Sequence, residues 1–268
     1  MQSSVREATG KKKAQGFRPK KISIDEFSMR KGHHQYVTTI SDLDNHCLLE
    51  VIDSHKAEEI IAALKSLWTE EERLMVEEVS IDMWAGFAKV IKEVFPNARI
   101  VYDRFHVMQK VIKELDRIRR QSRITDKGAK RLILKNRKDL NEEEKAKLDS
   151  YLQQSQRLRR AYELKEELRS IFESRITVEE GKSQIVRWLN KGQQIYSDAV
   201  KTIRNHLEGI CQYFANRVTS GIMEGINNRI KVIKRQGYGF TNIDNFRARL
   251  LAVILALIVL NHHESRRA

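Results

Sequence analysis

Two aspartates at the ends of apolar stretches are the first residues that could do chemistry. Asp25 ends the run ISID and Asp82 ends VSID, so each is predicted to finish a β-strand. If both strands belong to one sheet, the two short carboxylates can converge and offer hard oxygen ligands to a cation. Taken singly, each is also typical of an aspartate that merely ends a strand.

Glu224 is the third candidate, in the segment GIMEGINNRIKVIKRQGYGF at 221–240. Apolar residues at 222, 226, 230 and 233 predict a helix with one buried stripe. Another stripe of this helix holds Glu224, Asn228, Lys231 and Arg235, and the same helix also carries Arg229 and Lys234. One interpretation is a solvated face with i, i+4 charge pairs. The other is a metal ligand followed by phosphate-binding groups, as a nuclease helix requires.

The composition favours a globular protein with a polyanionic partner. The chain has 268 residues, 41% of them apolar, and a formal net charge of +14. Nucleic acid is therefore the first candidate partner. Cys47 and Cys211 show no spacing typical of zinc ligands or of a disulfide framework. The N-terminus has no signal-peptide core and the apolar run at 250–260 is too short to span a bilayer, so we expect a cytoplasmic protein.

The elements that must position these residues follow from the periodicity of the first hundred residues. In chain order they are strands at 21–27, 34–41 and 46–54, a helix at 56–68, a strand at 76–84, a helix at 85–95 and a strand at 98–103. The turn at 42–45 predicts that the first three strands form an antiparallel meander. The following β-α-β order predicts a mixed sheet with helices packed on it.

The rest of the chain is predicted to be helical. Residues 1–20 form a basic tail or linker remnant, and 107–205 form an all-helical segment of about four helices. Residues 206–268 supply the closing helices. Trp188, in IVRWLNKG, is more typical of an amphipathic helix core than of a base-stacking position, although both interpretations are open.

Several segments resemble one known family. ISIDEFSMRKGHHQYVTTISDL, VSIDMW, VYDRFHV and TSGIMEGINNRIKVIKRQGYGFTNIDNFRARL are similar to the DDE catalytic domain of ISL3-family insertion-sequence transposases. The resemblance runs from about Lys21 to His263. It implies an α/β, RNase H-like fold: a mixed five-stranded sheet with flanking helices, divided into 21–106 and 206–268 by an all-α insertion at 107–205. It also implies that Asp25, Asp82 and Glu224 occupy the three catalytic positions.

The same resemblance implies cofactors, partners and accessory residues. Two Mg²⁺ ions, or Mn²⁺, would be held by the three carboxylates, with Asp25 between the ions. The partners would be the transposon ends and target DNA, bound by a homodimer or larger assembly near the bacterial nucleoid. Asp103 and His106, in DRFH, look like a C/DxxH signature that follows the fifth strand in related transposases; a structural role for His106 is equally open.

Alternatives to an active enzyme remain at this point. Full-length relatives carry an upstream zinc-binding region and a helix-turn-helix, so the chain resembles their catalytic part alone. A regulator or relict that binds DNA without cutting it is the main alternative, and a basic helical interaction protein is the third. The presence of all three carboxylates favours retained chemistry.

Overall fold

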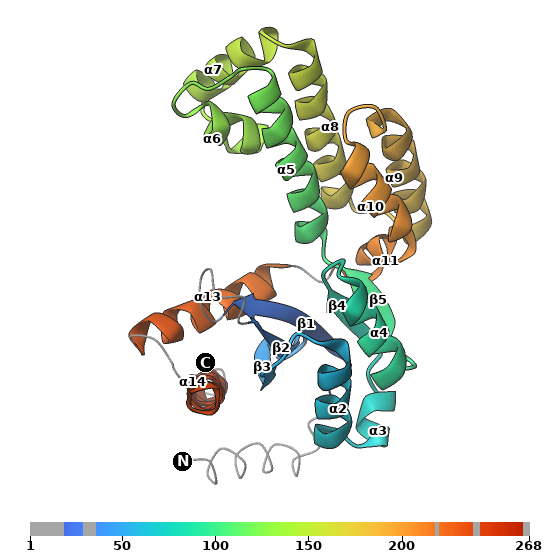
Figure 1. Cartoon of the computed structure of the whole chain (residues 1–268), viewed down its shortest axis with the longest axis vertical. Coiled ribbons are helices and arrows are strands. Elements are labelled where there is room, and N and C mark those ends of the chain that lie inside the picture. Colours follow the sequence, from blue (N-terminus) through green and yellow to red (C-terminus); the bar gives the residue numbers. More distant parts are fainter. Residues whose placement is uncertain (1–18, 29–35, 218–219, 238–241, 265–268) are drawn as a thin grey trace. The chain divides into compact units, whose positions relative to one another are not determined.

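A computed structural model describes residues 19–28, 36–217, 220–237 and 242–264. Within these ranges, side chains are described except at 220–224 and 254–264. The chain divides into two compact units: one comprises Met1–Val101 and Val218–Ala268, and the other Tyr102–Arg217. Each unit is described by itself below (Figure 1).

A five-stranded mixed sheet is the centre of the first unit. The strands are β1 (Lys21–Ser28), β2 (Tyr36–Asp42), β3 (Cys47–Ile52), β4 (Glu78–Ile81) and β5 (Arg99–Tyr102), in the spatial order β3-β2-β1-β4-β5. β1 pairs antiparallel with β2, and β2 with β3, while β1 pairs parallel with β4. The predicted antiparallel meander and mixed sheet are therefore confirmed.

Two strands have other ends than predicted: Asp25 does not end β1, and the strand expected at 76–84 covers only Glu78–Ile81, so that Asp82 lies directly after it. β1 continues to Ser28, and Asp25 pairs with Thr39 of β2. The parallel pairing with β4 covers only Lys21–Ser23, since β4 ends at Ile81. Asp25 therefore lies where β1 runs past the end of its parallel neighbour but is still held by the antiparallel one.

One face of β1–β3 is covered by the last two helices, α13 (Ser220–Gln236) and α14 (Ile243–Glu264) (Figure 1). Apolar side chains of both helices join those of the strands in one buried cluster, which includes Phe27, Val37, Leu48, Val51, Ile226, Ile230, Ile233, Phe246 and Leu250. The predicted buried stripe of α13 is confirmed at 226, 230 and 233, and position 222 lies outside the described side chains.

The opposite face of β1 carries Ile22 and Ile24, which are 0% and 1% exposed, because side chains alternate between the faces of a strand. Helices α2 (Ala57–Leu67) and α4 (Ala85–Val94) pack on each other, and α4 contacts β4. A short helix that the sequence pattern did not predict, α3 (Glu70–Leu74), begins with a capping box between Thr69 and Glu72.

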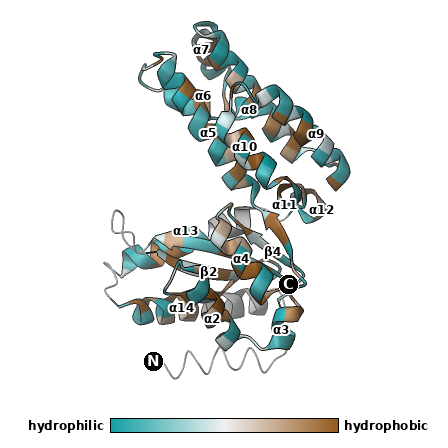
Figure 2. Cartoon of the chain, turned by 45° about the vertical axis from the view of Figure 1, so that its right-hand side comes forward, coloured by the Kyte–Doolittle hydropathy of each residue, from teal (hydrophilic) through white to brown (hydrophobic). Residues whose placement is uncertain are grey.

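The second unit is helical after the end of β5. Its α-helices are α5 (Arg104–Gln121), α6 (Ala129–Leu134), α7 (Glu142–Gln153), α8 (Gln156–Glu173), α9 (Val178–Gly192), α10 (Ser197–Asn205), α11 (Leu207–Cys211) and α12 (Tyr213–Asn216), with a 3-10 turn, η1, at Arg137–Asp139. The expected number of about four matches only the long helices α5, α7, α8 and α9. Hydrophilic and hydrophobic residues are mixed along the long helices of this unit (Figure 2), which is typical of helices that bury one side.

Trp188 belongs to the core of this helical unit. Its side chain is 0% exposed and its indole N–H donates to the carbonyl of Leu164 at 2.7 Å. The ring stacks on Tyr196 with centroids 6.1 Å apart. The core interpretation of Trp188 is therefore confirmed, and base stacking by this residue is excluded. Among the residues that the structure describes, no helix is long and apolar enough to cross a membrane.

A buried ion pair joins α14 to the sheet. The guanidinium of Arg247 donates from both Nε and a terminal nitrogen to the two oxygens of Glu50 in β3, each at 2.6 Å. The Glu50 side chain is only 6% exposed, and the hydrogen bond to it raises the pKa of Arg247. The pair fixes one end of α14 on the strand farthest from β5.

Replacing Arg247 by alanine is expected to destabilise the first unit, because it leaves the Glu50 carboxylate buried without its partner. Loss of one member of a buried pair costs about 3–5 kcal/mol, and the partial exposure of Arg247 favours the lower end, about 3 kcal/mol. Urea unfolding measures the change. Lys89→Ala is the matched control: it breaks the exposed Lys89–Glu58 pair and should cost no more than about 1 kcal/mol. Equal losses in the two variants would contradict the structural role of Arg247.

Candidate active site

The strand register aligns the positions of Asp25 and Asp82 on neighbouring strands of the sheet. Ser23 of β1 pairs with Ser80 of β4 in parallel register, so both point to one face. Asp25 lies two residues further along β1 and therefore continues on that face, and Asp82 lies two residues beyond Ser80, directly after β4 ends at Ile81. Phe27, two residues beyond Asp25, packs in the cluster formed with α13 and α14, so this is the face that α13 covers.

Two hydrogen bonds hold the carboxylate of Asp25. One oxygen accepts from the backbone N–H of Glu26 at 2.8 Å. The other accepts from the side-chain amide of Asn227 in α13, also at 2.8 Å. The backbone carbonyl of Asp25 accepts from the Thr39 hydroxyl at 3.2 Å. Asp25 is therefore fixed both by its own sheet and by a helix about two hundred residues later in the chain.

Asn227 is a site residue that the sequence prediction missed. The predicted stripe from Glu224 used the i+4 spacing and selected Asn228, which is exposed. Asn227 instead lies three positions after Glu224, equally close to it on a helix surface. Its position between the buried Ile226 and Ile230 was the available signal, because such flanking positions are half-buried.

The position of Glu224 follows from the helix that contains it. Glu224 lies in α13, one turn before the residue that contacts Asp25, although its side chain is outside the described residues. The carbonyl oxygen of the Asn227 side chain is buried and has no hydrogen-bond partner among the residues described. One hard oxygen atom beside Asp25 is thus left unsatisfied.

Asp82 is fixed by the backbone that follows it. Its carboxylate accepts from the N–H of Trp84 at 2.9 Å, a local turn between the end of β4 and the start of α4. The side chain of Asp82 is half-buried. The turn leaves one carboxylate oxygen of Asp82 engaged by the backbone.

Negative charge accumulates around these aspartates. Burial raises the pKa of the neighbouring Glu26, the interaction with His55 opposes the rise, and the carboxylates of Asp82 and Asp25 add to it. Both aspartates therefore make ionisation of the Glu26 carboxyl group less favourable. A cation bound between the carboxylates would relieve this repulsion.

The exposed side of α13 is basic. Asn228, Lys231 and Arg235 of the predicted stripe are exposed, and so is Arg229 on the same helix. Lys234 differs, because its ammonium donates to the carbonyl of Ser28 at 3.0 Å and lies 5.4 Å from the centre of the Phe27 ring. Burial lowers the pKa of Lys234. Lys234 thus holds the end of β1, and the salt dependence of DNA binding tests whether it also contacts a phosphate.

Asp103 and His106 lie in the second unit, at the start of α5. The Asp103 carboxylate caps this helix by accepting from the N–H of Phe105 at 2.8 Å. His106 is half-buried, and its ring meets that of Phe105 edge-on at 5.6 Å. These contacts account for Asp103 as a helix cap, and an accessory role for either residue stays a prediction.

The chemistry of the donors suits a hard divalent cation. Among the described side chains, which do not include that of Glu224, no three His, Cys, Asp or Glu residues are grouped closely enough to hold a metal ion. Asp25, Asp82 and the unpaired Asn227 oxygen are all hard oxygen donors, which Mg²⁺ prefers. The residues present therefore fit such an ion better than a soft metal.

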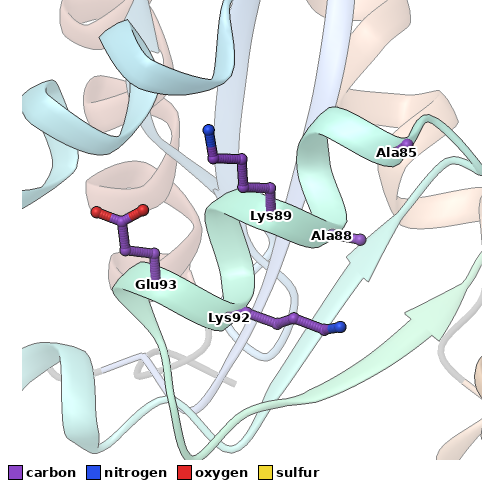
Figure 3. Close-up of a pocket in the computed structure, with 5 residues that line it drawn as sticks. All are labelled: Ala85, Ala88, Lys89, Lys92 and Glu93. Carbon is purple, nitrogen blue, oxygen red and sulfur yellow. The ribbon is translucent and has the colours of Figure 1, made fainter.

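A surface hollow along α4 has a different character (Figure 3). It is lined by Ala85, Ala88, Lys89, Lys92 and Glu93. Lys89 pairs with Glu58 at 2.6 Å and Glu93 with Lys65 at 2.7 Å, so two of its charges are already neutralised by α2. We assign no binding role to this hollow.

A double-mutant cycle tests the contact between Asp25 and Asn227. Because hydrogen bonds to a charged group contribute about 1.5–3 kcal/mol, Asp25→Ala and Asn227→Ala should show a coupling energy of at least about 1 kcal/mol in urea unfolding. Asn228→Ala, one position along the same helix, is the matched control and should be additive with Asp25→Ala within about 0.5 kcal/mol. Additivity for Asn227 as well would mean that α13 does not dock through this bond.

Comparison with known proteins agrees with the geometry. Residues 22–250 match the model of the ISL3 family of DDE transposases, described as "Transposase". The transposase of insertion sequence element IS1001 from Bordetella parapertussis is 30% identical over 86% of this chain and 60% of its own length. The transposase of IS1557 from Mycobacterium tuberculosis is 27% identical over 91% of this chain and 61% of its own length.

The chain thus spans about three-fifths of the length of these two relatives. The family match covers most of the sheet, the whole helical unit and the segment of α13 that contains Glu224. The chain belongs to the ISL3 family of DDE transposases.

Proposed function

We propose that this chain is the catalytic part of a DNA transposase, which cleaves phosphodiester bonds at transposon ends and joins the freed ends to target DNA. The observation that supports the proposal is the β1–β4 register, in which Asp25 and Asp82 each follow two residues after the paired Ser23 and Ser80, together with the hydrogen bond from Asn227 of α13 to Asp25. In this proposal the strand order β3-β2-β1-β4-β5 is that of an RNase H-like core. The helical segment at 107–205 is its insertion.

The acidic residues would act together as one cation site. Asp25, Asp82 and Glu224 would hold two divalent ions, Mg²⁺ or Mn²⁺, whose charge offsets that developing on the attacking and leaving oxygens of an in-line displacement. Asn227 would keep the Asp25 carboxylate in one orientation through its amide. The turn that fixes Asp82 would do the same on the neighbouring strand. Such pre-organisation lowers the reorganisation needed during the reaction.

The proposed reaction has two displacements at phosphorus. In the first, a water oxygen bonds to the phosphorus and the bond to the 3′-oxygen breaks, which leaves a 3′-hydroxyl at the transposon end. In the second, that 3′-oxygen bonds to a phosphorus of the target strand and the target's own 3′-oxygen departs. The proton of each attacking hydroxyl passes to solvent. No covalent bond between protein and DNA is needed.

The basic side of α13 would hold the DNA backbone. Arg229, Lys231 and Arg235 are exposed cations, and Asn228 is an exposed amide beside them. Contacts of this kind neutralise phosphates and position the DNA without reading its sequence. A homodimer or larger assembly on paired ends completes the proposal.

Supercoiled plasmid incubated with Mg²⁺ or Mn²⁺ tests the activity. We expect nicking that requires the metal, because the ions supply several kcal/mol of charge stabilisation. Asp82→Asn, Asp25→Asn and Glu224→Gln should each slow nicking by roughly a thousandfold. DNA binding, measured by fluorescence anisotropy, should persist in all three variants.

The matched control is Asp53→Asn. Asp53 is exposed and follows β3 directly, as Asp82 follows β4, so it tests whether any strand-end aspartate matters. This variant should nick as fast as the unmodified chain. Binding without nicking by the unmodified chain would instead support a DNA-binding regulator, and equal loss in the Asp53 variant would remove the special role of Asp82.

The salt dependence of DNA binding tests the basic side of α13. Lys231→Ala should reduce the slope of log affinity against log salt by about 0.9, the value for one lost phosphate contact on duplex DNA. Lys234→Ala is the comparison on the same helix. Because its ammonium is bonded to Ser28, this variant should leave the slope unchanged and lower the free energy of unfolding by about 1 kcal/mol. A slope that falls equally in both variants would assign Lys234 to the phosphates.

A further inference from the structure

The three tryptophans of the chain differ in their exposure. Trp68 and Trp188 are 9% and 0% exposed, and both are in ring contacts with core aromatic residues. Trp84 is 40% exposed. It is two residues beyond Asp82, and its backbone N–H donates to the Asp82 carboxylate. A large apolar ring is therefore held in solvent beside the candidate site.

The indole of Trp84 has a defined seat. Its ring meets the buried ring of Phe87 edge-on, with centroids 4.8 Å apart and planes at 90°. It also lies against Gly86, where a Cβ atom would come within 2.2–2.4 Å of three ring carbons. Only glycine at position 86 leaves room for the ring in this orientation. The exposed surface of the indole is thus pre-positioned rather than free to rotate.

We propose that Trp84 is a substrate-binding residue whose indole stacks on an unpaired nucleobase next to the scissile phosphate. The proposal rests on the proposed function, since it uses the same DNA and the same aspartates. An unpaired base brings a flat π-face that stacks on an aromatic side chain whatever its sequence. The backbone bond from Trp84 to Asp82 ties the stacking surface to the carboxylate that would act on the neighbouring phosphate.

A nucleobase suits this surface better than a protein partner does. The surface is one ring in size, whereas protein interfaces bury patches of many residues. It also adjoins carboxylates that would repel DNA phosphates in the absence of a cation, so a contact through the base rather than the phosphate is favoured there. Base stacking is thus assigned to the exposed Trp84 and not to Trp188, which is enclosed in the helical core.

Tryptophan fluorescence gives a readout that does not require activity. A short single-stranded oligonucleotide and its duplex are added to the full chain without divalent metal. Because Trp68 and Trp188 are buried, we expect the single strand to quench chiefly Trp84 and the blunt duplex to quench it less. In Trp84→Phe the residual fluorescence should change little on addition of either DNA.

Binding constants of three variants test the geometry. Trp84→Ala should bind the single strand roughly 5- to 150-fold more weakly, the effect of losing one stacked base. Trp84→Phe should retain most of the affinity. Gly86→Ala should weaken binding although it keeps the indole, because the methyl group displaces the ring from its seat. Leu74→Ala, which removes another exposed apolar side chain of this unit, is the control and should bind normally.

The salt slope separates stacking from charge contacts. Trp84→Ala should lower affinity without changing the slope, whereas Lys231→Ala should change the slope. Unchanged binding in Trp84→Ala, or undiminished quenching in Trp84→Phe, overturns the inference and leaves the nicking proposal standing. If Trp84→Ala binds DNA more weakly but Gly86→Ala binds normally, the claim that contact with Gly86 fixes the orientation of the indole is wrong. A chain that binds no DNA at all overturns both proposals. Quenching of Trp84 by a protein but not by DNA overturns the inference and assigns the ring to a protein partner.

Discussion

Parallel pairing between β1 and β4 determines which carboxylates can act together in this chain. With Ser23 opposite Ser80, Asp25 and Asp82 occupy corresponding positions along the two neighbouring segments. A slip of one residue would end this correspondence and turn the side chains of one strand to the opposite face. The antiparallel partner β2 then carries β1 past the end of β4, so that Asp25 is held in a strand while Asp82 is released into a turn. The two aspartates are thus held by different backbone environments, a strand for Asp25 and a turn for Asp82.

Repulsion between neighbouring carboxylates makes this arrangement unfavourable, and the surrounding contacts offset that repulsion. Asp25, Asp82 and Glu26 crowd negative charge at the end of the sheet, which opposes the ionisation of Glu26. Two residues of α13 donate hydrogen bonds to β1: Asn227 to the Asp25 carboxylate and Lys234 to the Ser28 carbonyl. The apolar stripe of α13 and the buried Arg247–Glu50 pair secure the helices that carry these groups. Stability supplied by the hydrophobic face therefore supports charge that is unfavourable by itself, as is common at functional sites.

Much of this architecture could be predicted from residue patterns, and the misses have physical causes. The alternation of apolar and polar residues, with the turn at 42–45, predicted the meander. The 3.6-residue spacing of apolar residues predicted the buried stripe of α13. The extension of β1 beyond Asp25 was not predictable, because it depends on β4 stopping early while β2 continues. Asn227 was missed because the i+3 and i+4 spacings are equivalent until the rotation of the helix against the sheet is known. Trp84 gave no signal at all, since the exposure of a lone aromatic residue depends on Gly86 and the turn before α4.

The first unit is assembled from two separated stretches of chain, and this affects how it must be made. During synthesis the strands emerge first, followed by the whole of residues 102–217, before α13 and α14 exist to cover the face that carries Phe27. At typical translation rates the delay is on the order of ten seconds. The helical unit is continuous and can fold during that interval, whereas the nascent sheet waits with an uncovered apolar side and an unpaired Glu50. Ribosome-bound chains that end before residue 220 are therefore the species that we expect chaperones to bind.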